Sequence, residues 1–196
     1  MTAKDWNECN MHENYITDKT FDRIDSLTKG EYENCTFNNC DFSDKDFSEF
    51  KFADCMFNGC NLSLIKLNKT AFRDIQFKDC KMLGLRFDSC SDFGLSFSFN
   101  SCQLNHSSFF RTKIKHTIFE NSRLQETDFA EADLTAVVFD NCNLIQAIFD
   151  HTTLEKADFR TSYNYSIDPE TNRIKKAKFS IGGVSGLLEK YDIDLC

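Results

Sequence analysis

Large apolar residues recur at every fifth position along most of the chain, separated by polar and charged residues. A period of five fits neither the 3.6 residues of a helical turn nor the two-residue alternation of a flat strand. We therefore predict that the chain turns once in each repeat and winds into a solenoid. Two tracts carry this pattern, with the central residues Phe37, Phe42, Phe47, Phe52, Phe57, Leu62, Leu67, Phe72, Phe77, Met82 and Phe87, and then Phe99, Leu104, Phe109, Ile114, Phe119, Leu124, Phe129, Leu134, Phe139, Leu144, Phe149, Leu154 and Phe159.

A second and smaller inward position lies two residues before each centre, which predicts a short extended piece in every repeat. Cysteine often fills it, and in a dry interior a thiol acts as a compact apolar group. No CxxC spacing occurs, so we predict neither a metal site nor a cofactor. Outside this position stand only Cys9 and Cys196, which we expect to be exposed. The inward cysteines are Cys35, Cys40, Cys55, Cys60, Cys80, Cys90, Cys102 and Cys142.

Whole repeats such as 40–44 (CDFSD), 132–136 (ADLTA) and 157–161 (ADFRT) resemble the motif of the pentapeptide-repeat family. That motif is a small residue, Asp or Asn, Leu or Phe, a small polar residue and any residue. The resemblance implies an all-β fold, a right-handed quadrilateral parallel β-helix with four repeats in each coil. It also implies that the small and central residues point inward and the other three outward.

With four repeats per coil, every fourth repeat stacks on the same face. In the second tract Phe alternates with Leu or Ile at the centre, so two opposite faces are expected to carry columns of Phe. Backbone groups pair between coils about one strand spacing, 4.8 Å, apart. The predicted structural core of this half is Phe99, Phe119, Phe139 and Phe159 on one face and Phe109, Phe129 and Phe149 on the other.

Two places depart from the period. The interval from Phe87 to Phe99 is not a multiple of five, so we expect a slip of two positions within 90–97, as a bulge or kink. Within 43–50, Lys45 and Phe50 stand where small inward residues belong. We expect a local distortion or a widened coil there.

The period also suggests three regions: an N-terminal cap at 1–30, the solenoid at 31–161, and a C-terminal loop, last coil and capping helix at 162–196. Phe179 follows Phe159 by one full coil of four repeat lengths, so the chain is expected to rejoin that Phe column after the loop. A short C-terminal helix is expected to bear four apolar residues on one side. This side either closes the last coil or forms a homodimer, and both interpretations stay open for Val184, Leu187, Leu188 and Tyr191.

Charge is arranged in bands along the chain. Residues 31–65 carry a net charge of −5, residues 66–119 carry +5, and residues 120–159 carry −7, within a total of −8. This balance disfavours direct binding to nucleic acid, which requires clustered Lys and Arg. The acidic band is our candidate partner surface, with solvated surface charge as the alternative. Its residues are Glu120, Glu126, Asp128, Glu131, Asp133 and Asp140, beside an apolar stripe of Ile118 and Val138.

The sequence favours a binding protein over an enzyme. It contains no nucleophile motif, glycine-rich phosphate loop or HExxH, and a filled solenoid offers no pocket. The histidines His106, His116 and His151 are expected at outward, solvated positions, and His12 precedes the repeats. No stretch of about 18 apolar residues could span a membrane. The first ten residues lack a secretory leader pattern, so we expect a cytoplasmic location with reduced thiols.

In length, sign of charge, number of coils and C-terminal segment, the chain resembles the bacterial Qnr-like branch of the family. That resemblance implies a rod that mimics duplex DNA, binds DNA gyrase or topoisomerase IV, and is linked to quinolone resistance. Two features depart from this branch: the chain lacks long loops inserted in the solenoid, and its middle band is basic. The alternative is a scaffold or regulatory binding module for a protein other than a topoisomerase.

Overall fold

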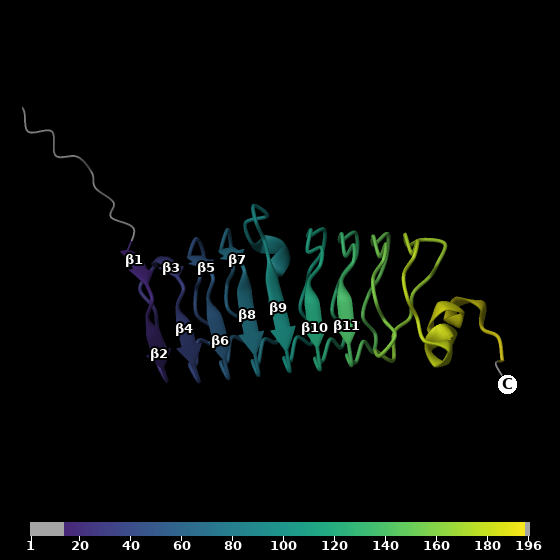
Figure 1. The fold of residues 1–196 in the computed structure, drawn as a ribbon, viewed down its shortest axis with the longest axis horizontal. Helices are drawn as coiled ribbons and strands as arrows, with labels where there is room; N and C mark the ends of the chain where they lie inside the picture. Colours follow the sequence, from purple (N-terminus) through teal and green to yellow (C-terminus); the bar gives the residue numbers. More distant parts are fainter. Residues whose placement is uncertain (1–13, 195–196) are drawn as a thin grey trace, which may run out of the picture.

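The chain is described by a computed structural model that covers residues 14–194. Its successive coils lie side by side along one axis and form a rod, with the C-terminal segment at one end (Figure 1). Every pair of hydrogen-bonded strands is parallel. The prediction of an all-β parallel solenoid is thereby confirmed.

Two parallel sheets form two of the faces of the rod. Face 1 is a four-stranded sheet with the order β1-β3-β5-β7, and face 2 is a seven-stranded sheet with the order β11-β10-β9-β8-β6-β4-β2. Isolated bridges hold the other two faces, such as that between Gln103 and Arg123 on face 3 and that between Asp128 and Ile148 on face 4. The strands are β1 Asn14–Thr17, β2 Thr20–Asp22, β3 Gly30–Glu33, β4 Thr36–Asn38, β5 Lys51–Ala53, β6 Met56–Asn58, β7 Ala71–Arg73, β8 Ile75–Lys78, β9 Phe97–Asn100, β10 Ile118–Glu120 and β11 Val138–Asp140.

The five-residue period has its cause in the corners of the rod. Two residues after most centres the backbone takes a positive φ, a left-handed conformation that turns the chain from one face to the next. Asn, Asp and His tolerate this conformation better than most other residues, and glycine tolerates it best. The three histidines of the second tract all stand at such corners, with φ of 60° at His106, 60° at His116 and 52° at His151.

A continuous column of Phe rings runs through the rod behind face 2. Neighbouring rings are nearly parallel, with centroids 4.6–5.3 Å apart. Burying each ring contributes roughly 1.5–3 kcal/mol relative to exposure. The column extends the one expected from the second tract back to the first strands and contains Phe21, Phe37, Phe57, Phe77, Phe99, Phe119, Phe139, Phe159 and Phe179.

A second column lies behind face 4 and meets the first across the interior. Its rings are Phe87, Phe109, Phe129 and Phe149, with centroids 4.5–5.3 Å apart. Rings of the two columns meet edge to face, as between Phe109 and Phe119 at 5.8 Å and 86°. Such edge-to-face pairs add about 0.5–1.5 kcal/mol beyond their buried area. The interior is therefore filled by interlocking aromatic rings.

The inward cysteines are free thiols packed into the core, apart from Cys90, which is half-buried. Burial raises the pKa of Cys55 and of Cys142 to about 12, so both stay protonated at neutral pH. The Cys142 thiol donates a hydrogen bond to the Phe119 carbonyl at 3.3 Å. No metal-binding arrangement of three His, Cys, Asp or Glu residues occurs between residues 14 and 194. Cys9 and Cys196 lie outside the described residues.

The segment 43–50 keeps a regular backbone, contrary to the expected distortion. Phe50 is buried and stacks on Phe47 at 5.0 Å, while the Lys45 side chain is exposed. The hydrogen bonds between coils continue here, with Phe47 N donating to Lys66 O and Lys66 N to Lys45 O, both at 2.9 Å. The interior accommodates Phe50 because its ring packs against the neighbouring aromatic rings. Lys45 does not widen the coil because its side chain points outward.

The slip of two positions forms a small loop that projects from the rod (Figure 1). It begins with the 3-10 helix η1, Phe87–Ser89, and ends where β9 pairs with β8. Phe99 lies opposite Phe77 in this pairing, two positions later than a regular coil would place it. Phe97 points inward and is 6% exposed, whereas Phe93 is 75% exposed. The Arg73 guanidinium lies 5.3 Å from the centre of the Phe93 ring.

Residues 14–30 form a shortened first coil, in which Phe21 of β2 lies opposite Phe37 although the chain between them is shorter than four repeats. Ile24 and Leu27 pack against the core beside it. The proposed cap at 1–30 thus contains a coil of the solenoid itself, and its residues 1–13 lie outside the described part of the chain.

At the other end, Phe179 stacks on Phe159 at 5.3 Å, after the loop at 164–172. The C-terminal helix consists of two 3-10 helices, η2 Ile181–Leu187 and η3 Glu189–Tyr191, and not of one regular α-helix. The η2 segment contains three glycines, which disfavour an α-helix. Within residues 14–194 no helix is long and apolar enough to cross a membrane.

Candidate protein-interaction surface

Four of the eight residues of the predicted partner surface lie together on face 2. Ile118 pairs in register with Val138, and Glu120 pairs in register with Asp140, in neighbouring strands β10 and β11. Because side chains alternate along a strand, the apolar and the acidic pair both point outward while Phe119 and Phe139 point inward. We call the four outward residues the β10–β11 surface. It presents an apolar row beside an acidic row.

The two carboxylates of this surface carry unbalanced charge. Glu120 accepts a hydrogen bond from the Asn100 amide at 2.6 Å, and Asp140 accepts one from the Thr161 hydroxyl at 2.7 Å. Among residues 14–194 neither forms an ion pair with Lys, Arg or His. These hydrogen bonds hold the carboxylates in place without cancelling their charge. The surface therefore suits a cationic partner.

The structure does not bring the other four acidic residues to this surface. Glu126 lies at the corner between faces 3 and 4, 3.2 Å from His106. Asp128 lies on face 4, where it accepts a hydrogen bond from the Ala130 amide at 2.9 Å. These positions follow from the winding, because residues five apart lie on successive faces. Sequence proximity in a solenoid therefore does not create a common surface.

Glu131 and Asp133 also lie away from the β10–β11 surface, and each of them forms an ion pair. Glu131 lies at the corner between faces 4 and 1 and binds the Arg111 guanidinium, which lowers its pKa. Asp133 lies on face 1, 3.0 Å from Lys115. The pKa of Asp133 is also lowered: burial opposes the shift, but hydrogen bonds from Thr135 and Lys115 outweigh it. Bases of the preceding coil thus balance part of the acidic band.

The four apolar residues expected on one side of the C-terminal helix differ in exposure. Leu187 packs against the core and Leu188 is half-buried, whereas Val184 is 40% exposed and Tyr191 is 50% exposed. The tighter turn of a 3-10 helix separates residues that an α-helix would align. Leu187 thus helps to cover the last coil. A homodimer contact through the exposed residues stays a prediction.

A cluster of bases near the C-terminus was missed from the sequence. Lys156, Lys175 and Lys176 are exposed around the corner of face 1 in the last two coils. The basic run at 173–178 (RIKKAK) is the signal in the sequence. This run lies beyond the regular repeats, and the charge bands defined above end at residue 159.

Comparison with solved structures gives similar solenoids. A trypsin-treated variant of QnrB1, a plasmid-mediated fluoroquinolone resistance protein, gives a TM-score of 0.56 at 19% identity, over 93% of this chain and 98% of that chain. A second trypsin-treated variant of QnrB1 gives 0.49 at 20% identity, over the same shares of 93% and 98%. HetL, involved in heterocyst differentiation regulation in the cyanobacterium Nostoc sp. strain PCC 7120, gives 0.32 at 13% identity, over 86% of this chain and 85% of that chain.

At these identities the likeness to solved structures concerns the fold alone. A comparison with the sequences of curated proteins found no match. The family model described as a pentapeptide repeat region matches residues 31–97 and 95–164. These two matches span more than half of the chain and contain every strand from β4 to β11. The chain therefore belongs to the pentapeptide-repeat family.

Proposed function

We propose that this protein acts without catalysis, by presenting the outer surface of its solenoid to a protein partner. The observation that carries this proposal is the difference between the inward and the outward positions of each repeat. The central inward position holds mostly Phe and Leu, the second inward position holds mostly small residues such as Cys, and the outward positions carry the charged residues. In such a filled rod only the outward residues are free to vary and to contact another molecule. Extended repeat proteins bind other proteins through surfaces of this kind.

The leading partner is a type II topoisomerase, DNA gyrase or topoisomerase IV, bound through mimicry of duplex DNA. The likeness in fold to QnrB1 supports this choice. So does the local density of charge: residues 120–159 carry −7 in two coils, a length of about 10 Å at one strand spacing per coil. Duplex DNA carries one negative charge per ~1.7 Å of its axis, which is a similar density.

Within this acidic half, the β10–β11 surface is the proposed point of contact. Glu120 and Asp140 bear the unbalanced charge, and Ile118 is 47% exposed beside them. A protein that binds DNA offers Lys and Arg to the phosphates, and these side chains would meet the two carboxylates. The apolar row adds contact area that duplex DNA itself does not offer.

The alternative function is a scaffold or regulatory binding module for a protein unrelated to topoisomerases. The middle band favours it, because residues 66–119 carry +5 and interrupt a continuous DNA-like surface. The ion pairs of Arg111 with Glu131 and of Lys115 with Asp133 also reduce the field of the acidic band. This alternative keeps the outer surface as the functional feature but changes the partner.

Supercoiling of relaxed plasmid by purified gyrase tests the leading proposal. The protein is titrated into the reaction with and without a fluoroquinolone. We expect it to inhibit supercoiling in the absence of the drug, or to restore supercoiling in its presence, at micromolar concentrations. An unchanged reaction under both conditions would remove the topoisomerase proposal and leave the scaffold.

A pair of variants then locates the contact. The double variant E120K/D140K reverses the charge of the β10–β11 surface. The control E126K/E131K makes the same change in net charge at two corners outside this surface. We expect the first variant to lose its effect on gyrase and the second to keep most of it, with both showing the circular dichroism of the native protein. Equal loss in both variants would indicate that net charge, and not this surface, determines binding.

A further inference from the structure

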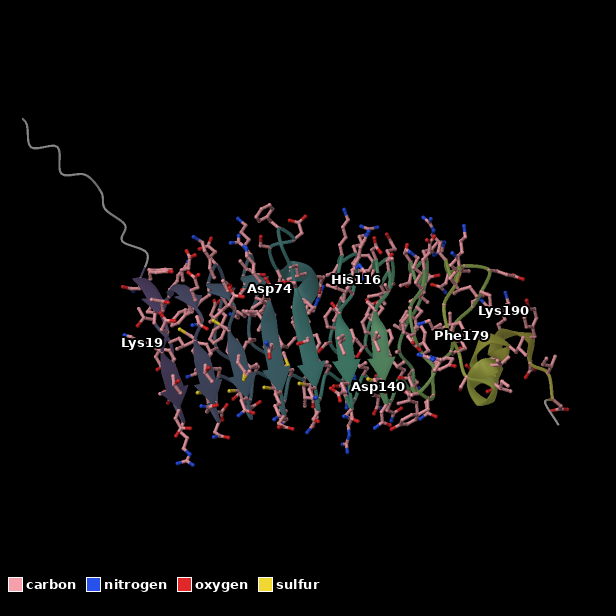
Figure 2. All side chains as sticks on the ribbon, viewed as in Figure 1. Lys19, Asp74, His116, Asp140, Phe179 and Lys190 are labelled. Atoms are coloured by element: carbon pink, nitrogen blue, oxygen red, sulfur yellow. The ribbon has the colours of Figure 1, made fainter. Side chains whose placement is uncertain are left out.

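The C-terminal end of the rod is covered over only part of its width. Ile167 N donates a hydrogen bond to Gly186 O at 2.9 Å, which fixes η2 over the end of the faces on which Tyr165 and Ile167 are buried. On the other two faces the columns end at Ile174 and Phe179, which are only half-buried. Figure 2 shows Phe179 at this end, close to the C-terminal segment. The last coil thus has an edge that the described chain leaves open.

The hydrogen-bond pattern of the preceding coil shows which donors this edge presents. There Leu154 N donates to Arg173 O, Lys156 N to Lys175 O, and Phe159 N to Lys178 O, at 2.8–3.0 Å. Each of these N–H groups points toward the next coil. One coil later the equivalent donors have no acceptor within residues 14–194, and they are the N–H groups of Ile174, Lys176 and Phe179.

The same edge also presents acceptors. In the preceding coil the carbonyls of Thr152 and Ala157 accept from Arg173 N at 3.0 Å and from Lys178 N at 2.8 Å. Their equivalents one coil later, the carbonyls of Asn172 and Ala177, accept no hydrogen bond from the described residues. An edge with both donors and acceptors at strand spacing is a template for one more extended chain.

Three lysines flank this edge with unbalanced charge. Lys156, Lys175 and Lys176 are exposed, and none of them forms an ion pair within residues 14–194. Lys156 and Lys176 occupy the same corner one coil apart, with φ of 61° and 60°. The neighbouring Arg173, by contrast, binds Glu155 at 3.0 Å. The three ammonium groups therefore lie beside the open edge without a counter-charge.

We propose that the open edge, 172–179, docks an acidic segment of a partner protein by β-augmentation, with the segment turning at the Lys176 corner as the coils themselves do. The backbone of such a segment satisfies both the donors and the acceptors of the edge, and its Asp and Glu side chains reach the three lysines. A nucleic acid fits less well, because a phosphodiester backbone has no donors for the carbonyls of Asn172 and Ala177. This contact uses the end of the rod and not a side face, and its charge is opposite to that of the β10–β11 surface, so it stands independently of the topoisomerase proposal.

Fluorescence anisotropy with a labelled peptide of alternating glutamate and valine tests the charge. The double variant K175E/K176E should weaken binding by at least about tenfold. The control K66E/K69E makes the same change in charge in the middle of the rod, where the edges are paired, and should bind as the wild type does. A peptide of alternating lysine and valine should not bind. Equal binding of both variants, or of both peptides, would overturn the proposal.

Amide hydrogen exchange measured by NMR tests the backbone contact. The acidic peptide should slow the exchange of the Ile174, Lys176 and Phe179 amides and leave that of Leu154 unchanged. Three results would overturn the proposal. The first is peptide binding without this protection, and the second is tighter binding of a single-stranded oligonucleotide of equal charge. The third is protection that rises with protein concentration alone, which would make a second copy the occupant. A gyrase assay of K175E/K176E separates this contact from the proposed function, because that activity should not change.

Discussion

Arg111 and Glu131 stand one coil apart at the same corner of the rod and form a bidentate ion pair, with distances of 2.7 Å from Nε to Oε2 and 3.1 Å from Nη2 to Oε1. The basic and the acidic band thus meet through pairs of side chains that the winding of the coils places next to each other. Lys115 and Asp133 form a second ion pair between the same two coils, on face 1. Part of the banded charge therefore forms ion pairs between neighbouring coils.

A double-mutant cycle measures how much this corner pair contributes. Because both side chains are exposed, we expect Arg111→Ala and Glu131→Ala to couple weakly in the free energy of unfolding. The coupling should disappear in high salt, since salt screens exposed charges. Urea unfolding of the wild type and the three variants at low and high salt gives the value. A large coupling that persists in salt would show that the pair is more constrained than its exposure indicates.

Acid should weaken the rod through Asp158. The hydrogen bond from Arg160 is the main cause that lowers the pKa of this carboxyl to about 2, and Lys178 adds to it. The folded state thus holds the ionised form more strongly than the unfolded chain does. Its contribution to stability is complete above about pH 4, the pKa of a free Asp, and is lost as the pH falls toward 2.

Chemical unfolding between pH 5 and pH 2 checks this dependence, with Asp158→Asn as the variant. We expect the variant to be less stable than the wild type at pH 5 and to approach it at the acid end. Asp44→Asn, at an exposed corner where no cation binds the carboxylate within residues 14–194, serves as the control. Parallel pH curves for the wild type and D158N would show that Arg160 does not hold the ionised carboxylate in the folded state.

The Phe columns should carry much of the stability of the rod. Phe119 is fully buried and stacks on Phe99 at 4.9 Å and on Phe139 at 5.1 Å. Phe119→Ala should therefore lower the free energy of unfolding by about 3–5 kcal/mol. Ile118→Ala, one residue away and 47% exposed, is the matched control and should change it little. Equal effects would contradict the inward and outward assignment of these neighbours.

The period of the sequence was sufficient to predict the coil, because the recurrence of Phe at every fourth repeat is enough to assign a face. It places Glu131 one coil after Arg111, but it could not predict every ion pair. Asp133 stands opposite Lys113 in the register of the coils and nevertheless binds Lys115, which depends on side-chain conformation. The shortened first coil, which places Phe21 opposite Phe37, could not be predicted either, because Phe21 does not belong to an uninterrupted run of repeats. At the C-terminus the apolar spacing suggested one helix face, while the glycines of η2 produced a 3-10 helix.

Tyr165 should limit the stability of the C-terminal end. Its ring is 5% exposed and lies 5.4 Å from Phe159, and its hydroxyl is buried without a hydrogen-bond partner within residues 14–194. A buried polar group left unpaired costs about 1–3 kcal/mol. Tyr165→Phe keeps the ring and removes the hydroxyl, so it should raise the free energy of unfolding. Tyr163→Phe, at a site that is 48% exposed, is the control and should not. Urea unfolding of both variants beside the wild type measures the difference.

The same hydroxyl explains why residue 183 is a glycine. A Cβ placed on Gly183 would lie 2.1 Å from Tyr165 Oη, so Gly183→Ala in the wild type should force η2 away from the last coil. In the Tyr165→Phe background this contact is gone, although the ring remains close, and the alanine should cost less. The two substitutions are therefore expected to couple favourably in thermal unfolding. Strict additivity would mean that the Tyr165 hydroxyl does not limit the space for a side chain at position 183.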